Sequence, residues 1–162
     1  MIPLFKSHFS IGKSILTLGD ESPEGGSDGI FEIAKTNNLS EVVLVEDSLT
    51  GFLEAAKKSE SLGIKLIFGL RLTACEGTST ENNCHKIIVF AKNDSGCKLL
   101  NKVYSEAFKG ETPAIDIRKL KEVWDEESLK LAIPFYDSFI FNNTMSFANC
   151  VPSFNFTKPT LF

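Results

Sequence analysis

The segment Leu44–Glu54, which reads LVEDSLTGFLE, decides how the fold of this chain is interpreted. Its first residues complete an apolar, valine-rich run that starts at Glu41, and such a run is typical of a buried parallel strand. Its last residues begin a helix, whose apolar side chains recur at helical spacing until Gly63 ends it. We expect Asp47 or Ser48 to cap this helix. The segment therefore predicts a strand, a polar turn and a helix in succession.

The rest of the chain repeats this alternation of short apolar strands and helices. We expect further strands at residues 2–5, 64–72, 85–91 and 129–133. We expect further helices after caps at Asp28, at one of the residues 93–95 and at Asp116, and an irregular Phe- and Asn-rich tail over residues 142–162. Strands that alternate with helices predict an α/β fold of mostly parallel strands, in the form of a partial or distorted (βα) barrel.

Composition and charge limit the classes of function. The 162 residues fit a single domain, and the hydrophobic share of 43% and the charged share of 23% are ordinary for a globular protein. The net charge is -4, and no run of Lys and Arg is longer than a pair. We therefore expect no strong nucleic-acid binding by this chain alone. No apolar run is long enough to span a membrane, so we expect no membrane partner.

The four cysteines form no C-x-x-C pair, which argues against a structural zinc site. The first residues do not have the pattern of a signal peptide, so we expect a cytoplasmic protein with reduced cysteines. Cys75 and Cys84 nevertheless flank a polar loop and could face each other.

In α/β folds, functional groups gather where the ends of the strands meet the following loops. That rule selects four segments, Lys6–His8, Val45–Ser48, Leu70–Leu72 and Pro134–Asp137. Within the first connection, Gly12-Lys13-Ser14 looks like the end of a phosphate-binding loop, but the glycine that such a loop needs further upstream is missing. We interpret that match as chance.

Four segments of the chain resemble one family in order and spacing. The segment 44–54 resembles LTDHGNxxGxxE, and 63–69, GIKLIFG, is similar to GIKPIIG. The segment 85–100 resembles HLxLLAKNxxGYxNL, and 113–120 resembles PxIDxxxL. Together they resemble the PHP (polymerase and histidinol phosphatase) domain of bacterial DNA polymerase III alpha subunits. The resemblance covers Leu4 to about Pro134, and the later part of that family's barrel has no counterpart in the sequence.

The resemblance implies a site at the strand ends. In active members of the family, His and carboxylate ligands there bind divalent metals that activate water for phosphoester hydrolysis. In this chain the opening His-x-His of the family is Lys6-Ser7-His8, and its Asp-His pair is Glu46-Asp47. The family's Glu after the glycine is replaced by Arg71. Lys and Arg offer no lone pair at neutral pH and would repel a divalent ion.

We therefore expect a relic pocket without a metal centre, formed by Lys6, His8, Glu46, Asp47 and Arg71. In this hypothesis Lys6 and Arg71 replace the metals electrostatically and pair with the two carboxylates. Should the pocket still bind zinc or manganese, its ligands would be His8, Glu46 and Asp47. The same three residues and Asp137 are the catalytic candidates, whereas His85 at the start of a strand is interpreted as structural.

Three functions follow from this pocket. The first is a non-catalytic PHP-like module associated with DNA replication, with a polymerase or a proofreading subunit as its partner. The second is a metal-dependent phosphoesterase, such as a 3'-5' exonuclease with a reduced metal site. The third is a module that binds a phosphate ligand through Lys6 and Arg71. The two cations favour the first function and argue against autonomous phosphoesterase activity, and the sequence leaves a homo-oligomer open.

Overall fold

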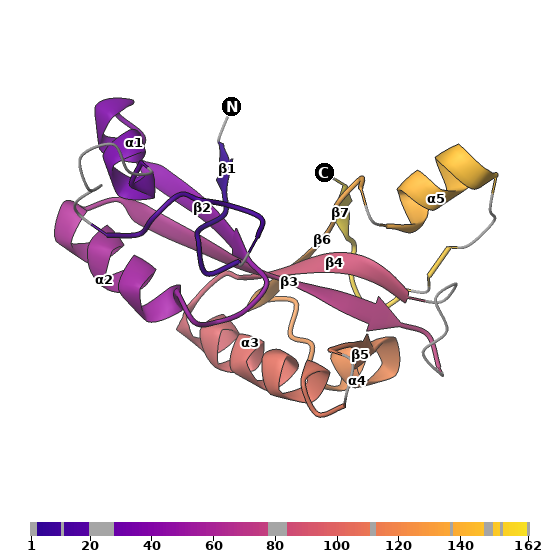
Figure 1. Ribbon diagram of the computed structural model, residues 1–162. Helices are drawn as coiled ribbons and strands as arrows, with labels where there is room; N and C mark the ends of the chain where they lie inside the picture. Colours follow the sequence, from indigo (N-terminus) through magenta and orange to yellow (C-terminus); the bar gives the residue numbers. More distant parts are fainter. Residues whose placement is uncertain are drawn as a thin grey trace. The chain divides into compact units, whose positions relative to one another are not determined.

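The chain divides into two compact units, Met1–Leu70 and Arg71–Phe162. The computed structural model describes residues 3–10, 12–19, 28–77, 84–110, 113–136, 138–147, 151–152 and 154–161 (Figure 1). The strand β3, Lys65–Cys75, contributes its first part to one unit and its last part to the other. Among the described residues, no helix is long and apolar enough to cross a membrane.

The first unit is built on parallel strands. β2 (Glu41–Glu46) pairs in parallel with β1 (Leu4–Phe5) on one side and with the first part of β3 on the other. Val43 lies opposite Leu4 in one pair and opposite Ile67 in the other. The prediction of a buried parallel strand at this place is confirmed. Because parallel strands end at the same edge, the residues after β1 and β2 are brought together.

Two helices follow the strands of this unit, and their predicted N-terminal caps are wrong. α1 (Ile30–Thr36) is preceded by Gly29 as its N-cap rather than by Asp28. α2 (Phe52–Leu62) begins after Gly51, so neither Asp47 nor Ser48 caps it. The predicted end of α2 is confirmed, since Gly63 adopts a left-handed conformation with φ of 65°.

The N-terminal loop, described over residues 6–10 and 12–19, packs closely on the start of α2. A Cβ atom placed on Gly51 would lie 2.6 Å from Cδ2 of Phe9 and 3.1 Å from Cδ1 of Leu18. Leu18 is fully buried. Only glycine therefore lets the loop approach the helix this closely.

The second unit contains the remaining elements. They are β4 (Cys84–Ala91), α3 (Asp94–Ala107), β5 (Ile115–Asp116), α4 (Ile117–Glu122), β6 (Leu129–Ile133), α5 (Phe139–Ser146) and β7 (Thr160–Leu161). β5 pairs in parallel with the last part of β3, and β7 pairs in parallel with β6. β4 and β6, however, are antiparallel, with Val89 opposite Leu131. The fold is thus mixed α/β, and the antiparallel pair departs from the expected barrel of alternating strands and helices.

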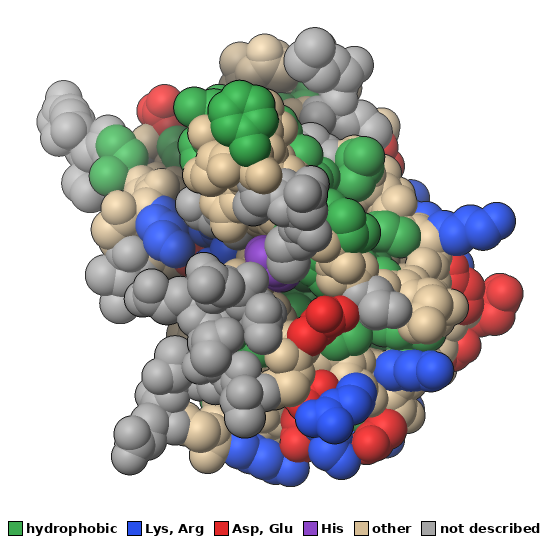
Figure 2. All heavy atoms as spheres, turned by 90° about the vertical axis from the view of Figure 1, so that its right-hand side faces the viewer, with side chains coloured by type: hydrophobic (Ala, Val, Ile, Leu, Met, Phe, Trp, Pro, Cys, Tyr) green, Lys and Arg blue, Asp and Glu red, His purple; other side chains and the backbone are tan. Residues whose placement is uncertain are grey.

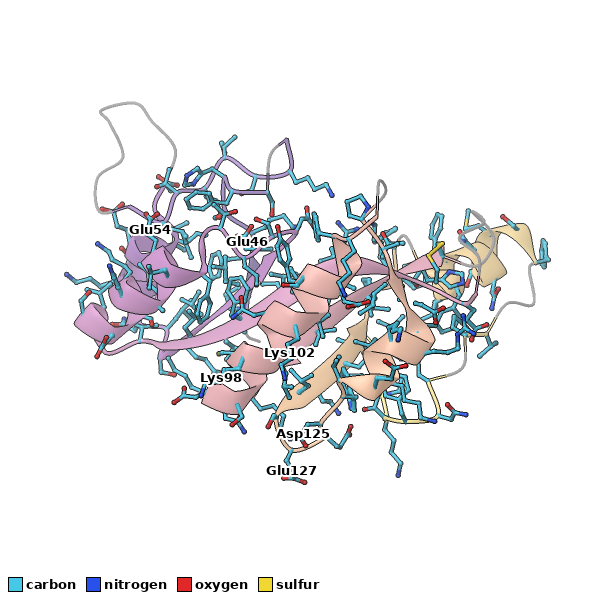
Figure 3. The ribbon with its side chains drawn as sticks, turned by 90° about the horizontal axis from the view of Figure 1, so that it is seen from below. Glu46, Glu54, Lys98, Lys102, Asp125 and Glu127 are labelled. Carbon is cyan, nitrogen blue, oxygen red and sulfur yellow. A yellow bond between two sulfur atoms is a disulfide. The ribbon has the colours of Figure 1, made fainter. Side chains whose placement is uncertain are left out.

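The predicted helices of the second unit are confirmed together with their caps. The side chain of Asn93 accepts a hydrogen bond from the Gly96 N–H at 2.8 Å, and Asp116 accepts one from the Arg118 N–H at 2.7 Å. Lys98 and Lys102, four residues apart on α3, are exposed on its outer side (Figure 3). The buried side of α3 faces the strands through Leu100, Val103 and Ala107.

The predicted irregular tail is wrong in part. Asn142 lies inside α5, and residues 160–161 form β7. The helix carries no buried residue, so its sequence lacks the apolar periodicity by which a helix is recognised. Ser138 caps it by accepting a hydrogen bond from the Ile140 N–H at 3.3 Å.

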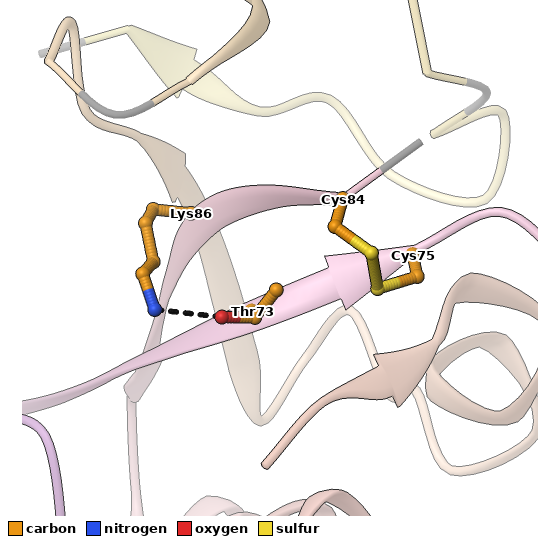
Figure 4. The surroundings of a disulfide bond; sticks show 4 residues. All are labelled: Thr73, Cys75, Cys84 and Lys86. Atoms are coloured by element: carbon orange, nitrogen blue, oxygen red, sulfur yellow. Dashed lines mark hydrogen bonds between the residues drawn. A yellow bond between two sulfur atoms is a disulfide. The ribbon is translucent and has the colours of Figure 1, made fainter. Parts of the chain in front are cut away.

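Cys75 and Cys84 form a disulfide that links the end of β3 to the start of β4 (Figure 4). Beside it, the Lys86 ammonium donates a hydrogen bond to the Thr73 hydroxyl at 2.6 Å. Thr73 and Cys75 are two residues apart on one strand, and so are Cys84 and Lys86 on the other, so both links lie on one face of the strand pair. The expectation of reduced cysteines is wrong for Cys75 and Cys84, whereas Cys97 is free.

Candidate functional site

Glu46, the last residue of β2, is the centre of the candidate site (Figure 3). Its side chain is completely buried. One carboxylate oxygen accepts a hydrogen bond from the Ser7 N–H at 2.6 Å, and the other accepts one from the Ser10 hydroxyl at 2.5 Å. Burial of a carboxylate is unfavourable unless such donors compensate it. Glu46 therefore fixes the N-terminal loop to the end of the central strand of the first unit.

The loop is shaped so that its serines reach Glu46. The Ser10 N–H donates to the Ser7 carbonyl at 3.0 Å, and the Phe9 N–H donates to the Ser7 hydroxyl at 3.2 Å. The Ser10 hydroxyl in turn accepts from the Asp47 N–H at 3.2 Å. Ser10 thus uses both hydrogen-bonding functions of its hydroxyl, one on each of two neighbouring acidic residues.

Asp47 lies between two lysines. The Lys6 ammonium is 3.1 Å from one carboxylate oxygen, and the Lys13 ammonium is 3.1 Å from the other. Partial burial alone would raise the pKa of Asp47, but hydrogen bonds from Lys13 and Lys6 and their positive charges outweigh that effect and lower the pKa. The Asp47 side chain is 31% exposed, so solvent screens part of this attraction.

The remaining predicted site residues, His8, Arg71 and Asp137, are not part of the cluster described around Glu46 and Asp47. His8 is exposed, and its ring packs against Phe9 with the ring centroids 4.3 Å apart. Arg71 is the first residue of the second unit, so its pairing with Glu46 or Asp47 stays a prediction. Asp137 lies outside the described residues. The part of the chain that the structure describes contains no group of three or more His, Cys, Asp or Glu side chains able to hold a metal ion.

His85 is a buried residue of β4, as expected for a structural histidine. Its ring meets that of Phe139 edge-on, with centroids 5.8 Å apart. Burial lowers its pKa, although the charge of Glu76 acts in the opposite direction. Burial therefore favours the neutral imidazole at neutral pH.

Three residues of the site were missed by sequence reasoning, namely Ser7, Ser10 and Lys13. Lys13 looked like part of a chance phosphate-loop match, and its place beside Asp47 depends on the turn in which the Lys13 N–H donates to the Ser10 carbonyl at 3.0 Å. No sequence pattern records such a turn. The abundance of short polar residues in the first connection was the one signal available.

The donor set of the described site does not suit a divalent metal. Both oxygens of Glu46 accept from the protein, and each oxygen of Asp47 faces an ammonium group. A metal ion would have to displace those ammonium groups, which carry charge of the same sign. The two lysines and the two carboxylates also balance in charge, so the cluster has no excess positive charge for an anionic ligand.

No protein-family model matches the chain, and no curated protein matches it. Among solved structures, it is similar to the crystal structure of a "putative metal-dependent phosphoesterase" from Bifidobacterium adolescentis, with 15% sequence identity and a TM-score of 0.33. The similarity covers 90% of this chain and 58% of the other, so the chain spans little more than half of that protein's length. At this identity and TM-score, the similarity determines neither the fold family nor the activity of this chain.

Proposed function

We propose that the chain is a non-catalytic module of the PHP type, in which protein ammonium groups stand where active relatives hold metal ions. The observation that supports this most strongly is the position of Asp47 between Lys6 and Lys13, each at 3.1 Å. Lys6 stands where the resembled family has its first histidine ligand. At this position a side chain that could bind a metal is replaced by an ammonium group that repels it.

The role of Glu46 supports the same proposal. A catalytic base has to reach its substrate, and a metal ligand has to reach its ion. Glu46 is instead fully buried and accepts from Ser7 and Ser10 of the N-terminal loop. In this proposal its function is structural, because it holds the loop that carries Lys6 and Lys13 against the strand end.

An association with DNA replication is the finer part of the proposal. It rests on the four sequence segments that resemble the PHP domain of the replicative polymerase. The partner in this proposal is a polymerase or proofreading subunit, and the module contributes binding rather than hydrolysis. The net charge of -4 favours a protein partner over autonomous binding of DNA.

An activity assay tests the non-catalytic part. The purified chain is incubated with manganese or zinc and an activated phosphodiester, and with single-stranded DNA labelled at its 5' end. We expect no hydrolysis above that of a matched preparation with Asp47→Asn, in which the paired carboxylate is removed. Metal-dependent hydrolysis that Asp47→Asn abolishes would contradict the proposal and favour the phosphoesterase. Thermal stabilisation by inorganic phosphate, lost in Lys6→Met, would instead favour the phosphate-binding module.

A further inference from the structure

A cavity of about 300 Å³ lies within the second unit and involves none of the residues of the candidate site at the end of β2. Residues of three segments line it, namely Glu76 and Gly77 after β3, Asp116 with three residues of α4, and the pair Asn155 and Phe156. Its volume is at the lower end of the range that small-molecule sites occupy. Figure 2 views the molecule from the side at which β5 and α4 lie in Figure 1, and charged side chains of both signs gather in the lower part of that view. The cavity is therefore a candidate site for a small, charged ligand.

Two walls of the cavity are held together by the sheet. β3 and β5 pair in parallel, with Cys75 opposite Asp116, so the residues that follow the two strands lie side by side. The disulfide also joins Cys75 to Cys84 of β4 (Figure 4). Asp116 is fixed in turn, because its carboxylate caps α4 by accepting from the Arg118 N–H at 2.7 Å. Backbone pairing, a covalent bond and a helix cap therefore define this part of the cavity.

The third wall is a turn that supplies an apolar surface. The Thr157 N–H donates to the Phe154 carbonyl at 3.1 Å, which places Asn155 and Phe156 at the two central positions of the turn. The Phe156 ring meets the Trp124 ring edge-on, with centroids 5.3 Å apart. The ring is thus held in place and gives the cavity an apolar side on which another ring can pack.

The charged residues of the cavity divide into one pair and two separate groups. The Arg118 guanidinium donates to both Asp116 oxygens, with Nη2 2.6 Å from Oδ2 and Nε 3.1 Å from Oδ1. The two charges of this pair offset each other. Glu76 and Lys121 are exposed and opposite in charge, and within the described part of the chain the Lys121 ammonium forms no ion pair. The cavity therefore presents one negative and one positive group to a ligand.

We propose that this cavity binds a free α-amino acid with an aromatic side chain. In this arrangement the carboxylate of the amino acid pairs with Lys121, its ammonium group pairs with Glu76, and its side chain packs against Ile117 and Phe156. A zwitterion has no net charge and so matches the balanced charge of the cavity. A simple anion would instead be repelled by Glu76 and Asp116, and a simple cation by the basic residues.

Isothermal titration calorimetry of the full chain with L-phenylalanine tests this site. Three analogues each lack one of the recognised groups. N-acetyl-L-phenylalanine lacks the ammonium group, phenethylamine lacks the carboxylate, and glycine lacks the apolar side chain. L-phenylalanine is expected to bind at least about tenfold more tightly than each analogue, because it alone satisfies both charges and the apolar side of the cavity.

Two substitutions locate the ligand in the cavity. Lys121→Met is expected to weaken the binding of L-phenylalanine to the level at which the wild type binds phenethylamine, and Glu76→Gln to the level of N-acetyl-L-phenylalanine. Both side chains are exposed, so the melting temperature is expected to change little. The matched control is Lys98→Met, which removes an exposed lysine of α3 outside the cavity and is expected to leave the affinity unchanged.

Three results would overturn the proposal. The first is a wild type that does not bind L-phenylalanine at millimolar concentration. The second is equal or tighter binding of N-acetyl-L-phenylalanine, because the cavity would then be a site for anions. The third is binding of L-phenylalanine that Lys121→Met and Glu76→Gln leave unchanged, because the ligand would then lie elsewhere on the chain.

Discussion

The hydroxyl of Ser10 connects two acidic residues, since it donates to the buried Glu46 carboxylate at 2.5 Å and accepts from the Asp47 N–H at 3.2 Å. Ser10 itself is almost fully buried. Together with the Ser7 N–H, this side chain attaches the N-terminal loop to the end of β2, and the loop in turn supplies the two lysines that flank Asp47. The stability of the site and its charge arrangement therefore depend on the same contact.

Replacement of Ser10 by alanine is expected to destabilise the protein. Ser10→Ala leaves one oxygen of the buried Glu46 without its donor, and such a loss typically costs about 1–3 kcal/mol of unfolding free energy. Urea unfolding followed by circular dichroism measures it. The control is Ser40→Ala, which removes an exposed hydroxyl and is expected to change the unfolding free energy by less than about 0.5 kcal/mol. Equal effects of the two substitutions would show that the Ser10–Glu46 contact does not stabilise the fold.

The ion pairs of Asp47 predict a dependence of stability on pH. Its pKa is lowered from 3.8 in the folded protein, so the unfolded chain binds the proton more tightly. The stabilisation is therefore present above the unfolded pKa and is lost as the pH falls through the folded pKa. Below about pH 4 the unfolding free energy of the wild type should decline more steeply than that of Asp47→Asn. Parallel profiles for the two proteins, measured at low ionic strength, would contradict the pairing.

The close approach of Phe9 to Gly51 predicts a steric effect. A methyl group at position 51 would overlap the Phe9 ring, so Gly51→Ala is expected to cost about 1–3 kcal/mol of unfolding free energy. In a Phe9→Ala background the same substitution should cost clearly less, because the overlapping ring is gone. Gly96→Ala is the comparison, since its Cβ would overlap the backbone carbonyl of Ser128 and no side-chain deletion can relieve it. Additive effects of Gly51→Ala and Phe9→Ala would refute the predicted contact.

The disulfide predicts a difference between oxidised and reduced protein. Cys75 and Cys84 are separated by nine residues in the sequence, and a loop of that length corresponds to a stabilisation of about 2.5 kcal/mol in the chain-entropy account. Addition of a dithiol reductant should lower the melting temperature of the wild type and leave that of Cys75→Ser/Cys84→Ser unchanged. Thiol titration of the unreduced, unfolded chain should detect the thiol of Cys97 but not those of Cys75 and Cys84. Four reactive thiols in that titration would be inconsistent with the bond.

Local patterns in the sequence predicted those elements that are defined by local physics. β2 followed from its valine-rich run, and α3 followed from its apolar spacing and from the Asn93 cap. α5 was missed because no face of it is buried, so its sequence has no apolar period. The antiparallel pairing of β4 with β6 was not predictable in this way, because an apolar run indicates a strand but not the direction of its neighbour.

The site was predictable only in part, for a similar reason. The expected cap at Asp47 follows from local propensity, but α2 begins only at Phe52, so Asp47 lies before the capping position and pairs with Lys6 and Lys13 instead. Lys6 could be named because it stands at a strand end. Lys13 could not, because the turn from Ser7 to Lys13 that brings it to Asp47 is fixed by the buried contact between Ser10 and Glu46.

The claim that ammonium groups stand in place of metal ions is tested most directly by the metal content of the purified chain. The protein is incubated with zinc and manganese, desalted and analysed by plasma mass spectrometry, beside a Lys6→His/Lys13→Ala variant that removes both ammonium groups and restores a ligand. The account predicts no more than trace metal in the wild type and an increase in the variant. Stoichiometric zinc or manganese retained by the wild type would contradict it.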